Sequence, residues 1–239
     1  MFKKILTTLI LSVMVISVMG CSKSGGNETA ATETTTEEET FVKDDQWALQ
    51  VNQKIEEYKD RPTGEIVFYG ASNFTLWRTM EEDMMPYVVQ NHGFGGSTDN
   101  DLMAYAEDFL YPYEPSIVFF QTGSNDLAEG LTVEEVIANK DKMYTLFRNH
   151  LSDATFIVMS GLPLPGRSEY WEDTKLINQE LEDYCETHDN MYFIDATSTM
   201  LDAEGNFRPE LFKEDGIHLN ADGHALWTEL MKQKLEEIQ

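Results

Sequence analysis

The stretch "IVFYGASNF", residues 66–74, joins a strand-like apolar run to a turn that carries a serine. Residues 66–69 suit the middle of a sheet, because β-branched and aromatic side chains favour strands. The run stops at Gly70, and Ser72 follows two positions later. Small residues after a strand usually only make a tight turn. Motifs elsewhere in the sequence are therefore needed to show whether Ser72 is functional.

Apolar runs of strand length alternate along the chain with longer segments of helical period. We predict strands at residues 65–69, 87–90, 116–121, 155–159 and 191–194. We predict helices at residues 99–109, 133–149, 171–187 and 221–237, the second of them opened by a capping box from Thr132 to Glu135. Strict alternation of strand and helix is typical of an α/β protein with a parallel sheet and helices on both faces.

In such a sheet, ligands bind beyond the carboxyl ends of the strands, where the loops converge. Polar and glycine-rich motifs lie in the corresponding places: "NHGFGGST" (91–98), "TGSND" (122–126) and "EDGIHLNADGH" (214–224). Each motif alone is weak, because Gly-Gly is usually a turn, "SND" is an ordinary helix start and a loop histidine usually lies on the surface. Their coincidence with Ser72 at one end of the sheet indicates a functional site.

These blocks resemble those of the SGNH hydrolases, also called the GDSL lipase/acylhydrolase family, over nearly all of residues 65–235. The matching blocks are "FYGASN", "GFGGST", "GSND" and "DGIHLNADGH", in the order of the family. The resemblance implies a flavodoxin-like three-layer sandwich with a five-stranded parallel sheet, and hydrolysis of carboxylic esters by a serine nucleophile. The family usually has an aspartate where this chain has Ala71, so we expect the serine loop to be supported differently.

Acyl transfer requires a base that activates the nucleophile, and histidine is the side chain suited to this near neutral pH. His218 is therefore the expected base for Ser72. Asp215, three residues earlier, is placed to hold one ring nitrogen, and a loop-capping role for it is the alternative. The resemblance assigns the oxyanion hole to the N–H groups of Ser72 and Gly96 and the amide of Asn125. Gly96 is also compatible with a simple turn.

Four residues close in sequence to the predicted site are candidates for substrate contact. We take Asn73, Trp77, Phe94 and Trp171 as candidate substrate contacts near the mouth of the site. The aromatic side chains would suit a sugar ring or a short acyl chain, and ordinary packing explains them equally well. We expect a small acyl ester, acetyl first, with carbohydrate as a candidate carrier.

The histidine pattern predicts neither a metal nor another cofactor. His224 lies six residues after His218, inside the last predicted helix, and could suggest a metal pair. No cluster with the spacing of metal ligands accompanies it, so we interpret His224 as structural.

The amino-terminal segment predicts export. In residues 1–20 a positive start precedes an apolar run shorter than the about 20 residues of a spanning helix, which is typical of a signal peptide. Its ending, "VMGC", resembles the lipobox of bacterial lipoproteins, in which Cys21 becomes lipidated; an ordinary signal peptide with an incidental cysteine is the alternative. Polar, acidic residues 21–45 are predicted to be a disordered tether, and residues 46–239 the hydrolase domain.

The formal net charge of −26 disfavours nucleic acid as a partner and repels anionic lipid. We therefore expect the lipid anchor alone to hold the protein at the bacterial cell surface, on the extracytoplasmic side of the membrane. Cys185, the remaining cysteine, is expected to be an inert core residue. Two other classes stay open: a solute-binding lipoprotein, and an inactive SGNH-fold protein that only binds glycan, for which Ala71 is the sole support.

Overall fold

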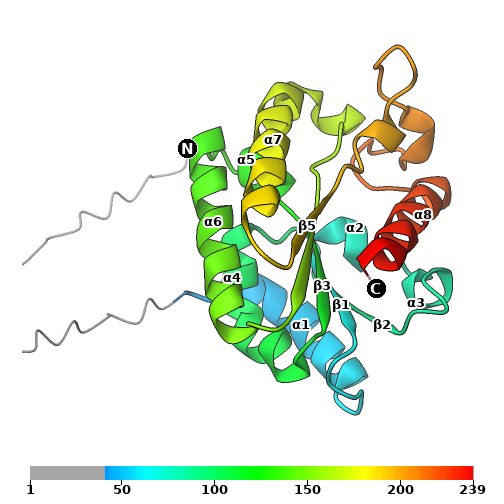
Figure 1. The fold of residues 1–239 in the computed structure, drawn as a ribbon. Helices are drawn as coiled ribbons and strands as arrows, with labels where there is room; N and C mark the ends of the chain where they lie inside the picture. Colours follow the sequence, from blue (N-terminus) through cyan, green and yellow to red (C-terminus); the bar gives the residue numbers. More distant parts are fainter. Residues whose placement is uncertain (1–40, 239) are drawn as a thin grey trace, which may run out of the picture. The chain divides into compact units, whose positions relative to one another are not determined.

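The computed structural model describes residues 41–238 of the chain. Its centre is a parallel five-stranded sheet in the order β2-β1-β3-β4-β5 (Figure 1). The strands are β1 (Ile66–Gly70), β2 (Val89–Gly93), β3 (Ile117–Gln121), β4 (Thr155–Met159) and β5 (Met191–Ile194). The direction of strand addition reverses between β1 and β3, and ligands bind at this switch point in open α/β sheets.

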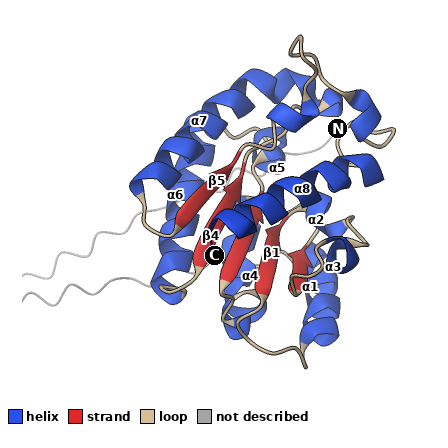
Figure 2. Cartoon of the chain, turned by 45° about the vertical axis from the view of Figure 1, so that its right-hand side comes forward, coloured by secondary structure: helices blue, strands red, loops and turns tan. Residues whose placement is uncertain are grey.

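Helices cover both faces of the sheet (Figures 1 and 2). One face packs against α1 (Asp45–Tyr58), α4 (Asp99–Phe109), α6 (Val133–His150) and α7 (Trp171–Thr187). The other face packs against α2 (Ser72–Thr75), α3 (Met80–Asp83) and α8 (Ala221–Ile238). Shorter elements are α5 (Ser124–Ala128), η1 (Tyr111–Tyr113), η2 (Pro165–Tyr170), η3 (Ser198–Met200) and η4 (Pro209–Leu211).

The predicted three-layer α/β architecture is confirmed, and the element bounds differ by a few residues. β2 begins at Val89 instead of residue 87 and runs on to Gly93. The predicted capping box of α6 is present: Thr132 Oγ1 accepts from the N–H of Glu135 at 3.3 Å, and Glu135 accepts from the N–H of Thr132 at 2.8 Å. Helix α1 has no counterpart in the sequence-based prediction. Among the described helices, none is long and apolar enough to cross a membrane.

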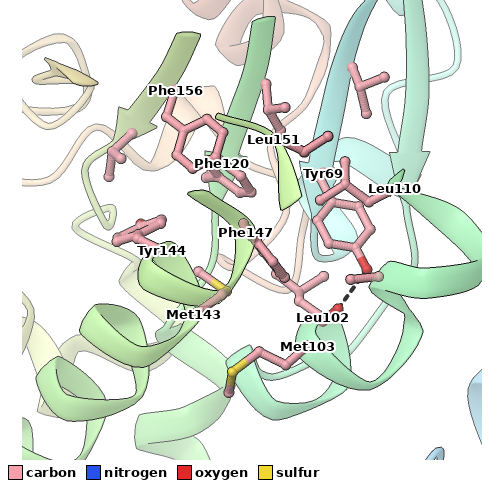
Figure 3. Packing of buried hydrophobic residues seen from close by; sticks show 14 of the residues in the cluster. Tyr69, Leu102, Met103, Leu110, Phe120, Met143, Tyr144, Phe147, Leu151 and Phe156 are labelled. Carbon is pink, nitrogen blue, oxygen red and sulfur yellow. Dashed lines mark hydrogen bonds between the residues drawn. The ribbon is translucent and has the colours of Figure 1, made fainter. Parts of the chain in front are cut away.

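Figure 3 shows the core between the sheet and the helices α4 and α6, where aromatic side chains interleave. Phe120 of β3 stacks on Phe147 of α6 with 5.7 Å between ring centroids and meets Phe156 edge-on at 5.2 Å. The fully buried Tyr69 of β1 donates its hydroxyl to the carbonyl of Leu102 at 2.7 Å, so its polar end is satisfied. These contacts fix β1 and β3, whose carboxyl ends carry the candidate site.

Cys185 on α7 lies in the same core with 5% of its surface exposed. Burial raises the pKa of its thiol to about 12, so the thiol stays protonated near neutral pH. A buried, protonated cysteine is unreactive, as expected from the sequence.

The folded domain begins before residue 46, the boundary expected from the sequence. The Asp44 carboxylate caps α1 by accepting from the N–H of Gln46 at 2.9 Å, and the Asp44 carbonyl accepts from the hydroxyl of Tyr105 at 2.7 Å. Phe41 packs against the core on the same face of the sheet. The predicted end of the tether at residue 45 is therefore wrong, because α1 and α4 supply a surface for residues 41–44. The rest of the predicted tether, the predicted signal peptide and Cys21 lie outside the described residues.

A variant chain that begins at Gln46 should unfold at a lower temperature than one that begins at Phe41. The shorter chain lacks the Asp44 cap, which contributes about 1 kcal/mol to the free energy of unfolding. A loss of about 1 kcal/mol lowers the melting midpoint by about 2–4 °C in a domain of this size. Thermal unfolding followed by circular dichroism measures the difference. In the longer chain, Asp44→Ala should reproduce part of the loss, while Asp45→Ala, at an exposed position, should not. Equal midpoints for the two chains would contradict the assignment.

Candidate active site

The turn after β1 is so tight that only glycine fits at position 70. A Cβ on Gly70 would lie 2.4 Å from the carbonyl oxygen of Gln121 on β3 and 3.1 Å from the ring of Phe74. The N–H of Ala71 donates to the same Gln121 carbonyl at 3.3 Å, and helix α2 begins at the next residue. The chain thus passes from strand to helix within one residue, which places Ser72 at the carboxyl edge of the sheet.

Ser72, His218 and Asp215 form a continuous hydrogen-bonded line. Ser72 Oγ lies 3.0 Å from Nε2 of His218, and Nδ1 of His218 lies 2.7 Å from Oδ2 of Asp215. The second carboxylate oxygen of Asp215 accepts from the N–H groups of Ile217 and His218 at 2.8 and 2.9 Å. The structure therefore brings the three predicted catalytic residues together, and Asp215 also has the loop-capping contacts that were its alternative explanation.

Hydrogen bonds keep Asp215 ionised. Desolvation raises the pKa of this carboxyl group, but the hydrogen bonds from His218 and Ile217 outweigh it and lower the pKa to about 2. A carboxylate only accepts hydrogen bonds, so Nδ1 of His218 carries the proton and donates it to Asp215. Nε2 is thereby left as the acceptor for the hydroxyl proton of Ser72.

The predicted oxyanion donors lie on three neighbouring segments. The N–H of Ser72 stands at the first position of α2, where the helix offers it no acceptor. Gly96 has a φ of +88°, and its N–H has no hydrogen-bond acceptor within residues 41–238. Asn125 Nδ2 donates one hydrogen to the carbonyl of Ser97 at 2.9 Å, which joins the loops after β2 and β3. Its second amide hydrogen has no acceptor in the part of the chain that the structure describes.

Arg167 is a residue of this site that the sequence-based prediction missed. Its Nη1 donates to Oδ1 of Asn125 at 3.0 Å and to the carbonyl and hydroxyl oxygens of Ser124, both at 2.9 Å. Because Arg167 only donates, it fixes which end of the Asn125 amide is the donor. Arg167 lies in "GLPLPGRSEYW" (161–171), which follows β4. The convergence of loops at the carboxyl edge is the signal that could have identified it.

The structure does not bring three of the four expected substrate contacts to the mouth of the site. Trp77 and Phe94 are 1% and 0% exposed and pack in the cores on opposite faces of the sheet, so their assignment to the mouth is wrong. Asn73 is also buried, and its Oδ1 accepts from the N–H of Leu219 at 2.9 Å, which anchors the histidine loop. Only the half-buried Trp171 remains a candidate for substrate contact.

His224 has the structural role that the sequence suggested. Its ring stacks on Trp77 with 4.9 Å between centroids, and its Nε2 lies 3.2 Å from the carbonyl oxygen of Asn73. Burial lowers the pKa of His224 to about 4, so the neutral ring donates from Nε2. Within the described part of the chain, no group of three or more His, Cys, Asp or Glu side chains is placed to hold a metal ion.

The fold and the site together define a class of protein. A serine, a histidine and a carboxylate in hydrogen-bonded line, next to free N–H donors, recur in serine hydrolases of unrelated folds. In this chain they stand at the switch point of a flavodoxin-like parallel sheet. A sequence model of the GDSL-like lipase/acylhydrolase family matches residues 69–226, and the chain belongs to this family.

Several solved structures share the fold at low sequence identity. A putative acylhydrolase from Bacteroides fragilis is 20% identical, with a TM-score of 0.67 over 79% of this chain and 96% of that chain. A catalytic mutant of an acetylxylan esterase from Geobacillus stearothermophilus is 15% identical, with a TM-score of 0.58 over 72% of this chain and 94% of that one.

A curated relative is an N-acylneuraminate cytidylyltransferase from Streptococcus agalactiae, 25% identical over 149 residues. The match covers 62% of this chain and 35% of the relative. The chain therefore spans about a third of the length of the curated relatives it matches.

Proposed function

We propose that this protein is a serine esterase that hydrolyses small acyl esters, with acetyl esters as the first candidates. The observation that carries the proposal is the line from Ser72 Oγ through His218 to Asp215, with steps of 3.0 and 2.7 Å. Such a line activates a serine hydroxyl for attack on an ester carbonyl. Membership of the acylhydrolase family supports the same class of reaction.

In the acylation step, Ser72 Oγ forms a bond to the ester carbonyl carbon while its proton passes to Nε2 of His218. The carbonyl oxygen becomes an oxyanion, which accepts hydrogen bonds from the N–H groups of Ser72 and Gly96 and from the Asn125 amide. Asp215 stabilises the imidazolium ion that forms. The carbon–oxygen bond to the alcohol then breaks, and His218 returns its proton to the departing oxygen, which leaves an acyl group on Ser72.

In the deacylation step, a water molecule takes the place of the alcohol. His218 removes one proton of the water, the remaining hydroxide adds to the acyl carbon, and the same donors stabilise the second oxyanion. Collapse of this intermediate breaks the bond to Ser72 Oγ, which recovers its proton from His218. The products are a carboxylic acid and the free alcohol.

The exposure of the site to solvent supports a substrate in which a small acyl group is esterified to a larger polar molecule. The side chains of His218 and Asp215 are 25% and 43% exposed, so the leaving alcohol departs toward solvent. An alcohol that extends into water, such as a sugar, fits this side of the catalytic line. The structural likeness to an acetylxylan esterase is consistent with a carbohydrate ester, although it establishes only the fold.

We propose that the protein is a lipoprotein, lipidated at Cys21 and held at the extracytoplasmic surface of the membrane. The support is the "VMGC" sequence and the net charge of −26, which gives the domain no attraction of its own to an anionic bilayer. Cys21→Ala should release the protein from the membrane fraction, whereas the core variant Cys185→Ala should remain there. Release of neither variant would refute the anchor.

The alanine at position 71 is weak evidence for the alternative that the protein has lost its activity. The backbone N–H of Ala71 donates a hydrogen bond to the carbonyl of Gln121 at 3.3 Å. The hydrogen bonds that join Ser72, His218 and Asp215 do not involve the Ala71 side chain. The line from serine to carboxylate is thus complete without the usual aspartate.

Turnover of p-nitrophenyl acetate by the purified protein tests the proposed function. We expect multiple turnovers per molecule, with a rate that EDTA leaves unchanged because each proposed step uses only groups of the protein and water. A solute-binding or glycan-binding protein would release no more p-nitrophenol than buffer does, and that result would overturn the proposal.

Asn125→Ala should lower kcat by roughly 10²- to 10³-fold with little change in KM, the usual effect of losing one oxyanion donor. Arg167→Met should lower kcat by a smaller factor, since the Asn125 amide remains but loses the partner that orients it. Steady-state kinetics with p-nitrophenyl acetate measures both. Asn149→Ala, at an exposed position at the end of α6, is the matched control. A loss confined to KM would contradict an oxyanion role for Asn125.

A further inference from the structure

Helix α1 contacts the loop that carries the oxyanion glycine. Gln50 Oε1 accepts a hydrogen bond from the N–H of Gly95 at 3.0 Å, although the two residues are 45 positions apart. Helix α1 precedes residues 69–226, the part of the chain that matches the family. This contact therefore comes from a segment outside the family match.

A second residue of α1 covers the next position of the loop. A Cβ on Gly96 would lie 2.6 Å from the indole carbon Cη2 of Trp47, so the ring packs directly on the glycine backbone. The Trp47 ring also packs at a tilted angle against Phe94, with 6.3 Å between the ring centroids. Gly95 and Gly96 are thus held from one side by a hydrogen bond and an aromatic ring.

The contact between α1 and the two glycines lies next to Ser72, the proposed nucleophile. The Cβ position of Gly95 lies 3.7 Å from Cβ of Ser72, so the held segment is adjacent to the serine. Gln50 satisfies the N–H of Gly95, whereas the N–H of Gly96 has no acceptor among the described residues. The contact therefore leaves the Gly96 amide as the available donor of the pair.

Two successive glycines are conformationally free, and an oxyanion donor is effective only when it is fixed before the reaction. We propose that α1 is part of the oxyanion hole, with Gln50 and Trp47 as positioning residues that fix the Gly96 N–H. The inference rests on the proposed esterase function. It assigns a role in turnover to a helix that precedes the residues matched by the family.

Gln50→Met tests the inference, because it removes the acceptor and keeps the length and helix propensity of the side chain. We expect kcat for p-nitrophenyl acetate to fall by about 10-fold, less than for loss of a donor itself, with KM within about 2-fold. Gln53→Met, on the same helix and exposed, is the matched control and should leave kcat unchanged. Melting temperatures of both variants should stay close to that of the wild type.

Amide hydrogen exchange provides a measurement that does not depend on turnover. In Gln50→Met the N–H of Gly95 should exchange faster than in the wild type, while Gln53→Met should show no change. Faster exchange with an unchanged kcat would overturn the inference and leave the esterase proposal intact. An unchanged exchange rate would overturn it as well. A wild-type protein without any turnover would overturn the proposed function, and this inference with it.

Discussion

Ser72→Ala should lower kcat for p-nitrophenyl acetate by about 10⁴- to 10⁶-fold, because no nucleophile remains for the acyl group. His218→Ala should cost about as much, since the hydroxyl of Ser72 then loses the base 3.0 Å away. The two residues act as a unit, so the double variant should be hardly slower than either single one. Steady-state kinetics on the three proteins measures this non-additivity.

Ser152→Ala is the control for these variants, because Ser152 is exposed in the loop that leads into β4, at the amino ends of the strands. Its kcat should equal that of the wild type. Multiplicative losses in the double variant would contradict the proposed line of proton transfer, since independent contributions would then come from Ser72 and His218.

Lys140→Met should lower the free energy of unfolding by about 3–5 kcal/mol, the usual cost of leaving a buried charge without its partner. Lys140 Nζ lies 3.2 Å from Asp99 Oδ2, with the two side chains 3% and 0% exposed. The equally buried Asp126 accepts from the N–H of Asp99 at 3.1 Å, and desolvation together with the Asp99 charge raises its pKa. The charge of Lys140 opposes this rise, so Lys140 pairs with Asp99 and also favours the ionised form of Asp126.

Urea denaturation measures the effect of Lys140→Met, and two further variants interpret it. Lys175→Met removes a surface partner of Glu172 that lies 2.8 Å away, and it should cost less than about 1 kcal/mol. Combining Lys140→Met with Asp99→Asn should recover part of the loss, because the unpaired charge is then removed too. A loss for Lys140→Met no larger than for Lys175→Met would contradict this account of the buried pair.

The hydrogen-bonded line of Ser72, His218 and Asp215 was predictable because its members carry local signals. Ser72 lies two residues after the end of β1, and Asp215 and His218 share one short loop. Their proximity therefore follows from the rule that the loops after parallel strands converge. Parallel strands buried on both faces appear as continuous apolar runs, and β1, β3 and β4 were predictable for this reason. β2 has the sequence VQNHG, which is not such a run, and its predicted bounds were displaced.

The supporting contacts were not predictable in the same way. Gln50 and Arg167 reach the site across 45 and 42 residues of sequence, and neither lies in a motif that marks its partner. The aromatic residues Trp77 and Phe94 lie beside the motifs in the sequence, yet both are buried in the hydrophobic cores. Local pattern does not distinguish an aromatic residue that lines a mouth from one that fills a core, because both sit next to the same strand ends.

Covalent labelling with diethyl p-nitrophenyl phosphate tests the central claim most directly, because this reagent traps an activated serine at its first step. We expect the release of one equivalent of p-nitrophenol, loss of esterase activity in parallel, and one diethylphosphoryl group on the peptide that carries Ser72, as located by mass spectrometry. His218→Ala should not be labelled on the same timescale. Unmodified Ser72 in a protein that still hydrolyses p-nitrophenyl acetate, or a label on another residue, would contradict the account.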